Sequence, residues 1–178
     1  VKLLTWNINS IRMRLPLLLA LAEETDADVI CLQETKAPVD KVPAAELAAA
    51  GYPHSVLAGF KGYNGVAIFS KHGLSETAVH DRCGREDARH VSGLLSEGIG
   101  VHNLYIPSGG DVPDPEQNDK FKYKLDFLAE ATAWFGASNG PQILVGDFNV
   151  APLENDVWSH RQLLDVVSHT PVEVDALE

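Results

Sequence analysis

Polar side chains with catalytic chemistry stand at the ends of four apolar runs in this sequence. In layered α/β folds, ligands collect where buried strands give way to polar loops, and a carboxylate there has rigid support while it faces solvent. The spacing therefore predicts one site assembled from strand ends. Its members are Asn7 at the end of a strand predicted over 2–7, Glu34 after 28–33, Tyr105 within 99–106, and Asp147 with Asn149 after 142–146.

Four of these side chains, Asn7, Glu34, Asp147 and Asn149, offer oxygen atoms as ligands. An oxygen-only set suits a hard cation such as Mg²⁺ or Mn²⁺ and suits zinc poorly, and the sequence has no closely spaced set of His or Cys residues. Taken singly, each residue has a plainer interpretation. An Asn or Asp after a strand is most often a turn former, Glu34 a solvated loop acid, and Tyr105 a half-buried strand aromatic.

The predicted elements favour an α/β fold with mixed sheets. Strand and helix alternate at both ends of the chain, whereas consecutive strands occupy the middle, and this order indicates layers rather than a simple parallel sheet. With 178 residues and 45% apolar content, the chain is large enough for one domain, residues 1–178. Helices are expected at 11–24, 43–50 (ended by Gly51) and 118–135, and further strands at 55–60, 64–70 and 88–95.

Cysteine usage and hydropathy favour a cytoplasmic protein. Cys31 lies inside an apolar run that predicts a buried thiol, and with Cys83 it forms neither a disulfide framework nor a zinc set. The segment from Arg12 to Ala22 superficially resembles a signal peptide, but its leucines follow one face of a helix that Glu23 continues. No apolar run reaches the length of a membrane-spanning helix.

The net charge of −11 counts against tight non-specific binding of nucleic acid, for which a basic face is the usual electrostatic footprint. A net charge says nothing of how charges are distributed, however, and carboxylates that hold a metal are part of the negative total. The charge therefore does not exclude DNA as a ligand.

Longer strings surround the candidate residues: Trp6–Arg12 (WNINSIR), Leu32–Lys36 (LQETK), Tyr63–Ile68 (YNGVAI) and Gly146–Pro152 (GDFNVAP). In this order they resemble the exonuclease III and AP endonuclease branch of the endonuclease/exonuclease/phosphatase superfamily. The GDFN string alone would indicate only the superfamily, whereas WNINSIR and QETK indicate the DNA-repair branch. The resemblance covers nearly all of the chain and weakens after Val157.

The resemblance implies a four-layer sandwich of two mixed β-sheets flanked by helices, incomplete at the C-terminus of this sequence. It also implies a Mg²⁺-dependent phosphodiesterase of base-excision repair, with Mn²⁺ as a substitute. Such an enzyme cleaves DNA at abasic (AP) sites and trims 3′ ends as a 3′–5′ exonuclease. The expected partner is duplex DNA with abasic sites or blocked 3′ ends, bound by a monomer without any membrane.

The resemblance further implies a role for each candidate residue. Glu34 is the principal metal ligand, and Asn7 assists at the metal. Asp147 activates or orients the attacking water, or protonates the leaving group. Asn149 holds phosphate or metal, and Tyr105 contacts the scissile phosphate. Their chemistry agrees, because an ionised Asp accepts a proton and because Asn and Tyr donate neutral hydrogen bonds to a phosphate.

Several basic side chains are candidates for contacts with DNA phosphates. Lys120, Lys122 and Lys124 lie around the start of the long predicted helix, and Lys36 and Arg89 are further candidates. A solvated helix face is an equally good interpretation of the three lysines, because exposed lysine is common.

Relatives of this kind continue with an Arg-x-Asp-His-like element and a closing Ser-Asp-His motif, and neither is present here. That Asp-His pair completes their active site, and neither His160 nor His169 has an Asp in the right context to replace it. We expect a fragment of a longer protein rather than a natural short homologue, because Pro171–Glu178 contains no closing apolar strand.

Two other functions stay open at this point. A non-catalytic homologue would bind nucleic acid or protein through the same fold. The acidic charge and the absent Asp-His pair favour this alternative, whereas the intact metal-site positions oppose it. An enzyme of the superfamily with a lipid or inositol phosphate substrate is opposed by the WNINSIR string.

Overall fold

The computed structural model describes residues 1–177, which divide into two compact units. Unit 1 comprises Val1–Tyr105 with Gly140–Asp147, and unit 2 comprises Ile106–Asn139 with the chain from Phe148 onward. The single domain expected over residues 1–178 stays a prediction. Among the described residues, no helix combines the length and the apolar character needed to cross a membrane.

The first sheet of unit 1 has the strand order β1 (Leu3–Asn7), β2 (Val29–Gln33), β4 (Val66–Ser70), β3 (His54–Ala58). β1 and β2 run parallel, which requires a crossover, and helix α1 (Ile11–Thr25) provides it. β4 pairs antiparallel with both β2 and β3. Every residue of β2 and β4 is buried, in keeping with their continuous apolar sequences.

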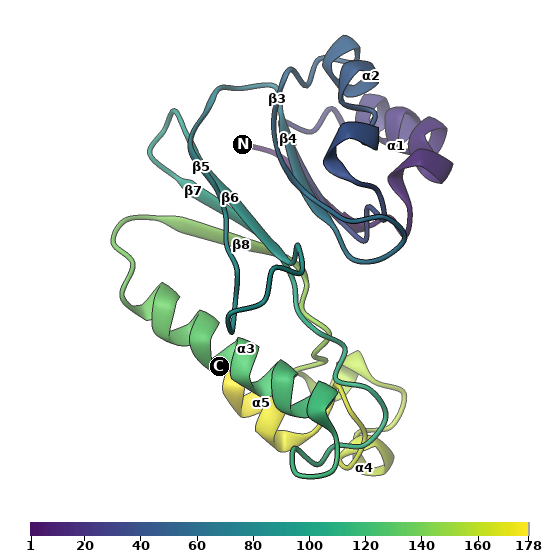
Figure 1. The fold of residues 1–178 in the computed structure, drawn as a ribbon, viewed down its shortest axis with the longest axis vertical. Helices are drawn as coiled ribbons and strands as arrows, with labels where there is room; N and C mark the ends of the chain where they lie inside the picture. The colour runs from purple at the N-terminus through teal and green to yellow at the C-terminus, as the bar shows by residue number, and fades with distance from the viewer. Residues whose placement is uncertain (178) are drawn as a thin grey trace. The chain divides into compact units, whose positions relative to one another are not determined.

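Helices cover one face of this first sheet (Figure 1). Leu18 of α1 and Leu47 of α2 (Ala44–Ala49) are fully buried in the core on that face. A short 3₁₀ turn, η1 (Val39–Lys41), precedes α2. Gly51, with φ of +99°, follows the end of α2, so the predicted stop is confirmed.

The second sheet has the strand order β5 (Leu74–Val79), β6 (His90–Leu95), β7 (Gly100–Tyr105), β8 (Gln142–Asp147). β5, β6 and β7 are antiparallel neighbours, whereas β7 and β8 are parallel. An apolar core joins the two sheets, and in it Cys31 and Ile68 lie together with Val91 and Val101. The predicted buried thiol of Cys31 is confirmed, and burial raises its pKa.

The sequence predicts most of these elements within two residues of their observed ends, and both sheets are mixed as expected. It does not predict β5, because Ser75, Glu76 and Thr77 leave that strand without apolar alternation. All three side chains are exposed at the edge of the sheet. Three short elements beyond residue 151 are also unpredicted: η2 (Glu154–Asp156), α4 (His160–Leu163) and α5 (Pro171–Leu177).

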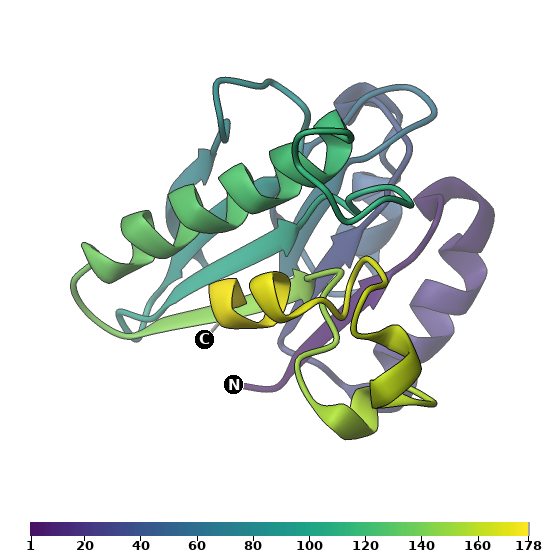
Figure 2. The same ribbon diagram turned by 90° about the horizontal axis from the view of Figure 1, so that it is seen from below.

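Unit 2 is organised around α3 (Asp119–Gly136) and a buried ion pair. The side chain of Asn118 caps α3 by accepting a hydrogen bond from the backbone N–H of Lys120 at 3.0 Å. α5 lies beside α3 (Figure 2). There, Glu173 of α5 forms an ion pair with Lys124 of α3, and both side chains are fully buried. Loss of one partner would leave an uncompensated buried charge.

The parallel pairing of β7 and β8 depends on a glycine. In this register Leu104 is opposite Gly146, and Tyr105 is opposite Asp147. Gly146 has φ of +143°, and a Cβ atom built on it would lie 1.9 Å from the carbonyl oxygen of Leu104. No side chain fits at that separation, so the glycine of the GDFN string lets β8 approach β7 closely enough to place Asp147.

We expect Gly146→Ala to destabilise the protein by at least about 2 kcal/mol, because backbone strain and the clash with Leu104 must both be relieved. Chemical denaturation followed by circular dichroism measures the change. Gly136→Ala is the matched control, since an added Cβ at Gly136 meets nothing within 4 Å. Its stability should stay equal or rise, and equal denaturation midpoints for the two variants would contradict the prediction.

Candidate active site

The ends of β1, β2, β7 and β8 bring together four predicted site residues of unit 1. In the first sheet Asn7 is opposite Gln33, so Glu34 follows directly beyond the paired position. In the second sheet Tyr105 is opposite Asp147 at the ends of the parallel pair. Parallel strands end at the same edge, and polar side chains therefore gather there.

One amide group links two carboxylates at this edge. The Nδ2 group of Asn7 donates to Glu34 Oε1 at 3.0 Å and to Asp147 Oδ2 at 2.8 Å. The hydroxyl of Tyr105 donates to the same Glu34 oxygen at 2.8 Å. The neutral amide of Asn7 thus holds together the carboxylates of Glu34 and Asp147, which would otherwise repel each other in this part-buried position.

These contacts set the ionisation of Glu34 and Tyr105 in opposite ways. Burial acts to raise the pKa of Glu34, but hydrogen bonds from Lys36, Asn7 and Tyr105 outweigh it and lower that pKa below its usual value. Burial and the bond to Glu34 raise the pKa of Tyr105 to about 12. At neutral pH the site therefore presents a carboxylate beside a neutral phenol.

Lys36 is the counter-ion of Glu34. Its ammonium nitrogen lies 2.8 Å from Glu34 Oε2 and also donates to Asn9 Oδ1 at 2.5 Å. The structure therefore places this cation at the carboxylate itself, which the sequence alone does not indicate. Its predicted contact with DNA stays a prediction.

The turn after β2 holds Glu34 in an unusual backbone conformation. The φ angle of Glu34 is +54°, in the left-handed region that few non-glycine residues adopt. The neighbouring loop supports this turn, because the N–H of Thr35 donates to the carbonyl of Gly65 at 3.1 Å. A Cβ on Gly65 would lie 2.1 Å from Thr35 Oγ1, so the glycine of the YNGVAI string permits the contact. Such strain is often stored at functional sites.

Arg89 holds the ring of Tyr105. Its guanidinium carbon lies 4.8 Å from the ring centroid, and its Nη1 donates to the Tyr105 carbonyl at 3.1 Å. The same guanidinium bonds to Asp87 at 2.6 Å and to Asn64 at 3.3 Å. Because the Arg89 side chain is only 14% exposed, these contacts position Tyr105, and a direct contact of Arg89 with DNA stays a prediction.

Asp87 and Asn64 are thus part of the site's support, although the sequence does not single them out. The YNGVAI string around Asn64 is the one available signal. Asn64 also donates to the carbonyl of Asp87 at 2.8 Å, which ties the two loops together. Nothing in the local sequence shows that these loops meet.

The donor set of these strand ends fits a hard divalent cation. Glu34 and Asp147 supply carboxylate oxygens, and Asn7 supplies an amide oxygen in addition to its donating group. Mg²⁺ and Mn²⁺ prefer such oxygen ligands. The residues therefore fit the metal that the sequence predicts.

Asn149, the fifth predicted residue, belongs to unit 2. Its backbone has φ of +51°, and its side-chain amide donates to the carbonyl of Ile106 at 2.9 Å. Its own carbonyl accepts a hydrogen bond from Lys124 Nζ at 2.5 Å. These contacts fix both the backbone and the side chain of Asn149 within unit 2.

The prediction that Lys124 contacts DNA is wrong. Its side chain is fully buried in unit 2, where it pairs with Glu173. Lys120 and Lys122 are exposed in the first turns of α3, and Lys122 pairs with Asp126 at 2.6 Å. Lys124 lies one helical turn after Lys120 on the same face of α3. At Lys124 this face is covered by α5 of the same unit and is therefore buried. DNA contacts of Lys120 and Lys122 stay predictions.

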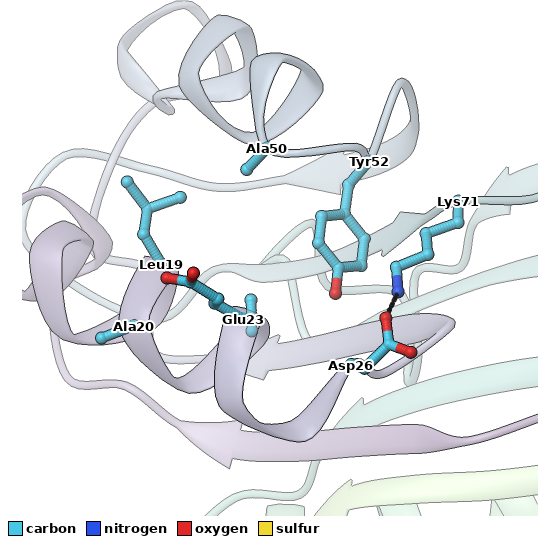
Figure 3. Close-up of a pocket in the computed structure, with 8 residues that line it drawn as sticks. Leu19, Ala20, Glu23, Asp26, Ala50, Tyr52 and Lys71 are labelled. Carbon is cyan, nitrogen blue, oxygen red and sulfur yellow. Dashed lines mark hydrogen bonds and ion pairs between the residues drawn. The ribbon is translucent and has the colours of Figure 1, made fainter.

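A separate pocket of 520 Å³ opens beside α1 (Figure 3). Leu19 and Ala50 line its apolar side, and Tyr52 lines it together with the ion pair of Lys71 and Asp26. None of the predicted site residues lines this pocket. The candidate site is therefore defined by the strand ends and not by this hollow.

Comparisons of the sequence with known proteins point to one family. The Endonuclease/Exonuclease/phosphatase family matches residues 4–167. The chain is 32% identical to the exodeoxyribonuclease of Bacillus subtilis, over 88% of the chain and 62% of that relative. It is 30% identical to exodeoxyribonuclease III of Haemophilus influenzae, over 88% of the chain and 60% of that relative. The chain thus spans about three fifths of the length of these relatives.

Solved structures agree with the sequence comparisons. An AP endonuclease from Archaeoglobus fulgidus matches with a TM-score of 0.90 and 32% identity, over 99% of the chain and 68% of that structure. A 3′–5′ exonuclease from Neisseria meningitidis matches with a TM-score of 0.89 and 32% identity, over 99% and 68% respectively. The expected fold class of two mixed sheets with flanking helices is confirmed. The chain belongs to the endonuclease/exonuclease/phosphatase family, and its relatives there are exodeoxyribonuclease III enzymes and AP endonucleases.

Proposed function

We infer that the protein is a Mg²⁺-dependent DNA phosphodiesterase of base-excision repair that cleaves at abasic sites and trims 3′ ends. The observation that carries this function is the amide of Asn7 that joins the carboxylates of Glu34 and Asp147, with the hydroxyl of Tyr105 on the same Glu34 oxygen. The names of the relatives support it, and a similar 3′ phosphatase from Neisseria was solved with a product DNA hairpin.

Glu34 and Asp147 are the residues that would hold the metal, with the amide oxygen of Asn7 as a further donor. Bound Mg²⁺ supplies positive charge that offsets the negative charge of a phosphate under attack by water. Lys36 balances the charge of Glu34 through its 2.8 Å ion pair. The protein's own contribution is to hold the two acids close together through Asn7 and to lower the pKa of Glu34 through Lys36, Asn7 and Tyr105.

The remaining side chains act on the phosphate and the water. Tyr105 stays protonated because its pKa is raised to about 12. Its one O–H, which bonds to Glu34 in this structure, turns to a phosphate oxygen when substrate binds and adds no negative charge. Asp147 orients the attacking water or accepts its proton. Asn149 holds the phosphate or the metal, as the family resemblance implies. Arg89 keeps the Tyr105 ring in place by stacking on it.

The first test uses the complete product of the reading frame on duplex DNA with a single abasic site, with Mg²⁺ and with chelator. We expect cleavage that chelator abolishes and that Glu34→Ala lowers by at least about 100-fold, since the metal loses its main anionic partner. Glu24→Ala removes the same charge from an exposed position of α1 and should leave the rate unchanged. A folded protein that binds this DNA without cleaving it would favour a non-catalytic homologue.

Tyr105→Phe removes one hydroxyl and leaves the ring that Arg89 contacts. We expect the single-turnover cleavage rate to fall by about 10–100-fold, because one donor to the phosphate is lost. Tyr52→Phe is the matched control, because the Tyr52 hydroxyl donates to the carbonyl of Ala27 at 2.8 Å in the helical core. An unchanged rate in Tyr105→Phe would rule out its contact with the phosphate.

The salt dependence of DNA binding tests the exposed lysines of α3. If Lys122 contacts a phosphate, Lys122→Ala should reduce the slope of log K against log salt by about one, and Lys120→Ala likewise. Lys41→Ala changes the same charge at an exposed residue of η1 and should leave the slope as it is. A wild-type slope in both α3 variants would show that these lysines only form a solvated helix face.

A further inference from the structure

Three histidines come together on one face of the second sheet. His80 follows β5, His90 opens β6, and His102 lies within β7. Ser92 is opposite His102 in the register, and because alternate residues share a face, His90 and His102 point to the same side. Val91 points to the other side, into the core between the two sheets. The histidines therefore lie on the opposite face from that core.

The ring nitrogens are close enough to share one ion. One nitrogen from each histidine lies within 4.8 Å of the other two. His90 Nε2 and His102 Nδ1 lie 3.0 Å apart. Two nitrogens bound to a zinc-sized ion at a tetrahedral angle are about 3.3 Å apart. His90 and His102 need only a small shift to reach this geometry, and His80, which is partly exposed, needs a larger one.

Two of these imidazoles, His90 and His102, form part of a directional chain of hydrogen bonds. Arg82 can only donate, so its Nη2 group, 3.0 Å from His90 Nδ1, places the His90 proton on Nε2. His90 then donates to His102 Nδ1, and His102 Nε2 donates to Gln142 Oε1 at 2.9 Å. Burial lowers the pKa of His80 to about 4 and that of His90 further, so both imidazoles are neutral at neutral pH.

We propose that His80, His90 and His102 bind one transition-metal ion of the zinc class, such as Zn²⁺, Co²⁺, Ni²⁺ or Cu²⁺. Imidazole nitrogen suits these ions, whereas Mg²⁺ prefers oxygen. Three imidazoles with a fourth position left open form a known ligand set for zinc. This nitrogen set differs in chemistry from the oxygen set around Glu34, and the proposal does not rest on nuclease activity.

Arg82 opposes the ion. Coordination through Nε2 moves the His90 proton to Nδ1, where it needs an acceptor, whereas Arg82 is a cation that can only donate. Arg82 must therefore turn aside when the ion binds. Glutamine at this position would remove the charge and offer an oxygen to the N–H of His90, as the supporting partners of metal-bound histidines do. Arg82→Gln should therefore tighten binding, which a cluster without a metal role would not show.

The test is a set of metal titrations of the protein in excess Mg²⁺, which saturates the oxygen ligands around Glu34 and Asp147. Co²⁺ is followed by its visible absorption, and Zn²⁺ by calorimetry. We expect one ion per chain in the wild type. His80→Gln and His102→Gln should each weaken binding by about 10–100-fold, and Arg82→Gln should tighten it by about 10-fold.

Two controls locate the ion. His54→Gln makes the same change at an exposed histidine of β3, and Glu34→Gln alters only the oxygen site. Both should bind Co²⁺ as the wild type does. Circular dichroism of the metal-free variants reports folding, and the partly exposed His80 gives a usable variant if His102→Gln does not fold. Three outcomes would overturn the proposal. The wild type does not bind the ion, or it binds with the same affinity as His80→Gln and Arg82→Gln, or Glu34→Gln is the one variant that loses binding.

Discussion

The repulsion between two carboxylates is the constraint on which the strand-end site depends. Glu34 and Asp147 come from different sheets, and the amide of Asn7 donates to both, at 3.0 and 2.8 Å. Tyr105 and Lys36 add a neutral donor and a cation to Glu34. In a part-buried position, unbalanced acids would take up protons or move apart. For Glu34 the neutral donors and Lys36 together prevent this, and two carboxylates against one ammonium group leave the net negative charge that a divalent cation requires.

Close approach of the backbone makes this arrangement possible. At Gly146 the carbonyl of Leu104 occupies the space of a side chain, and at Gly65 the hydroxyl of Thr35 does so. The first contact sets Asp147 opposite Tyr105, and the second supports the turn that carries Glu34. Close packing beneath the site therefore explains the glycines at these two positions of the recognisable strings.

The second sheet carries polar side chains with metal-binding or phosphate-binding chemistry on both of its faces. Tyr105 reaches the oxygen-rich site with Arg89 stacked on its ring. On the opposite face, His90 follows Arg89 directly, and His102 stands three positions before Tyr105 in the same strand. Oxygen donors and imidazoles favour different metals, because the two kinds of ligand differ in chemistry.

The sequence by itself determined the strand ends, the oxygen donors and the family, because these follow from local apolar runs and from strings of adjacent residues. It did not determine that Lys124 is buried against Glu173. Nor did it determine that His80, His90 and His102 form a cluster, because they are widely separated in the chain. Burial and clustering depend on which segments cover one another. Strand register and helix packing decide that, and residue spacing along the chain does not encode it directly.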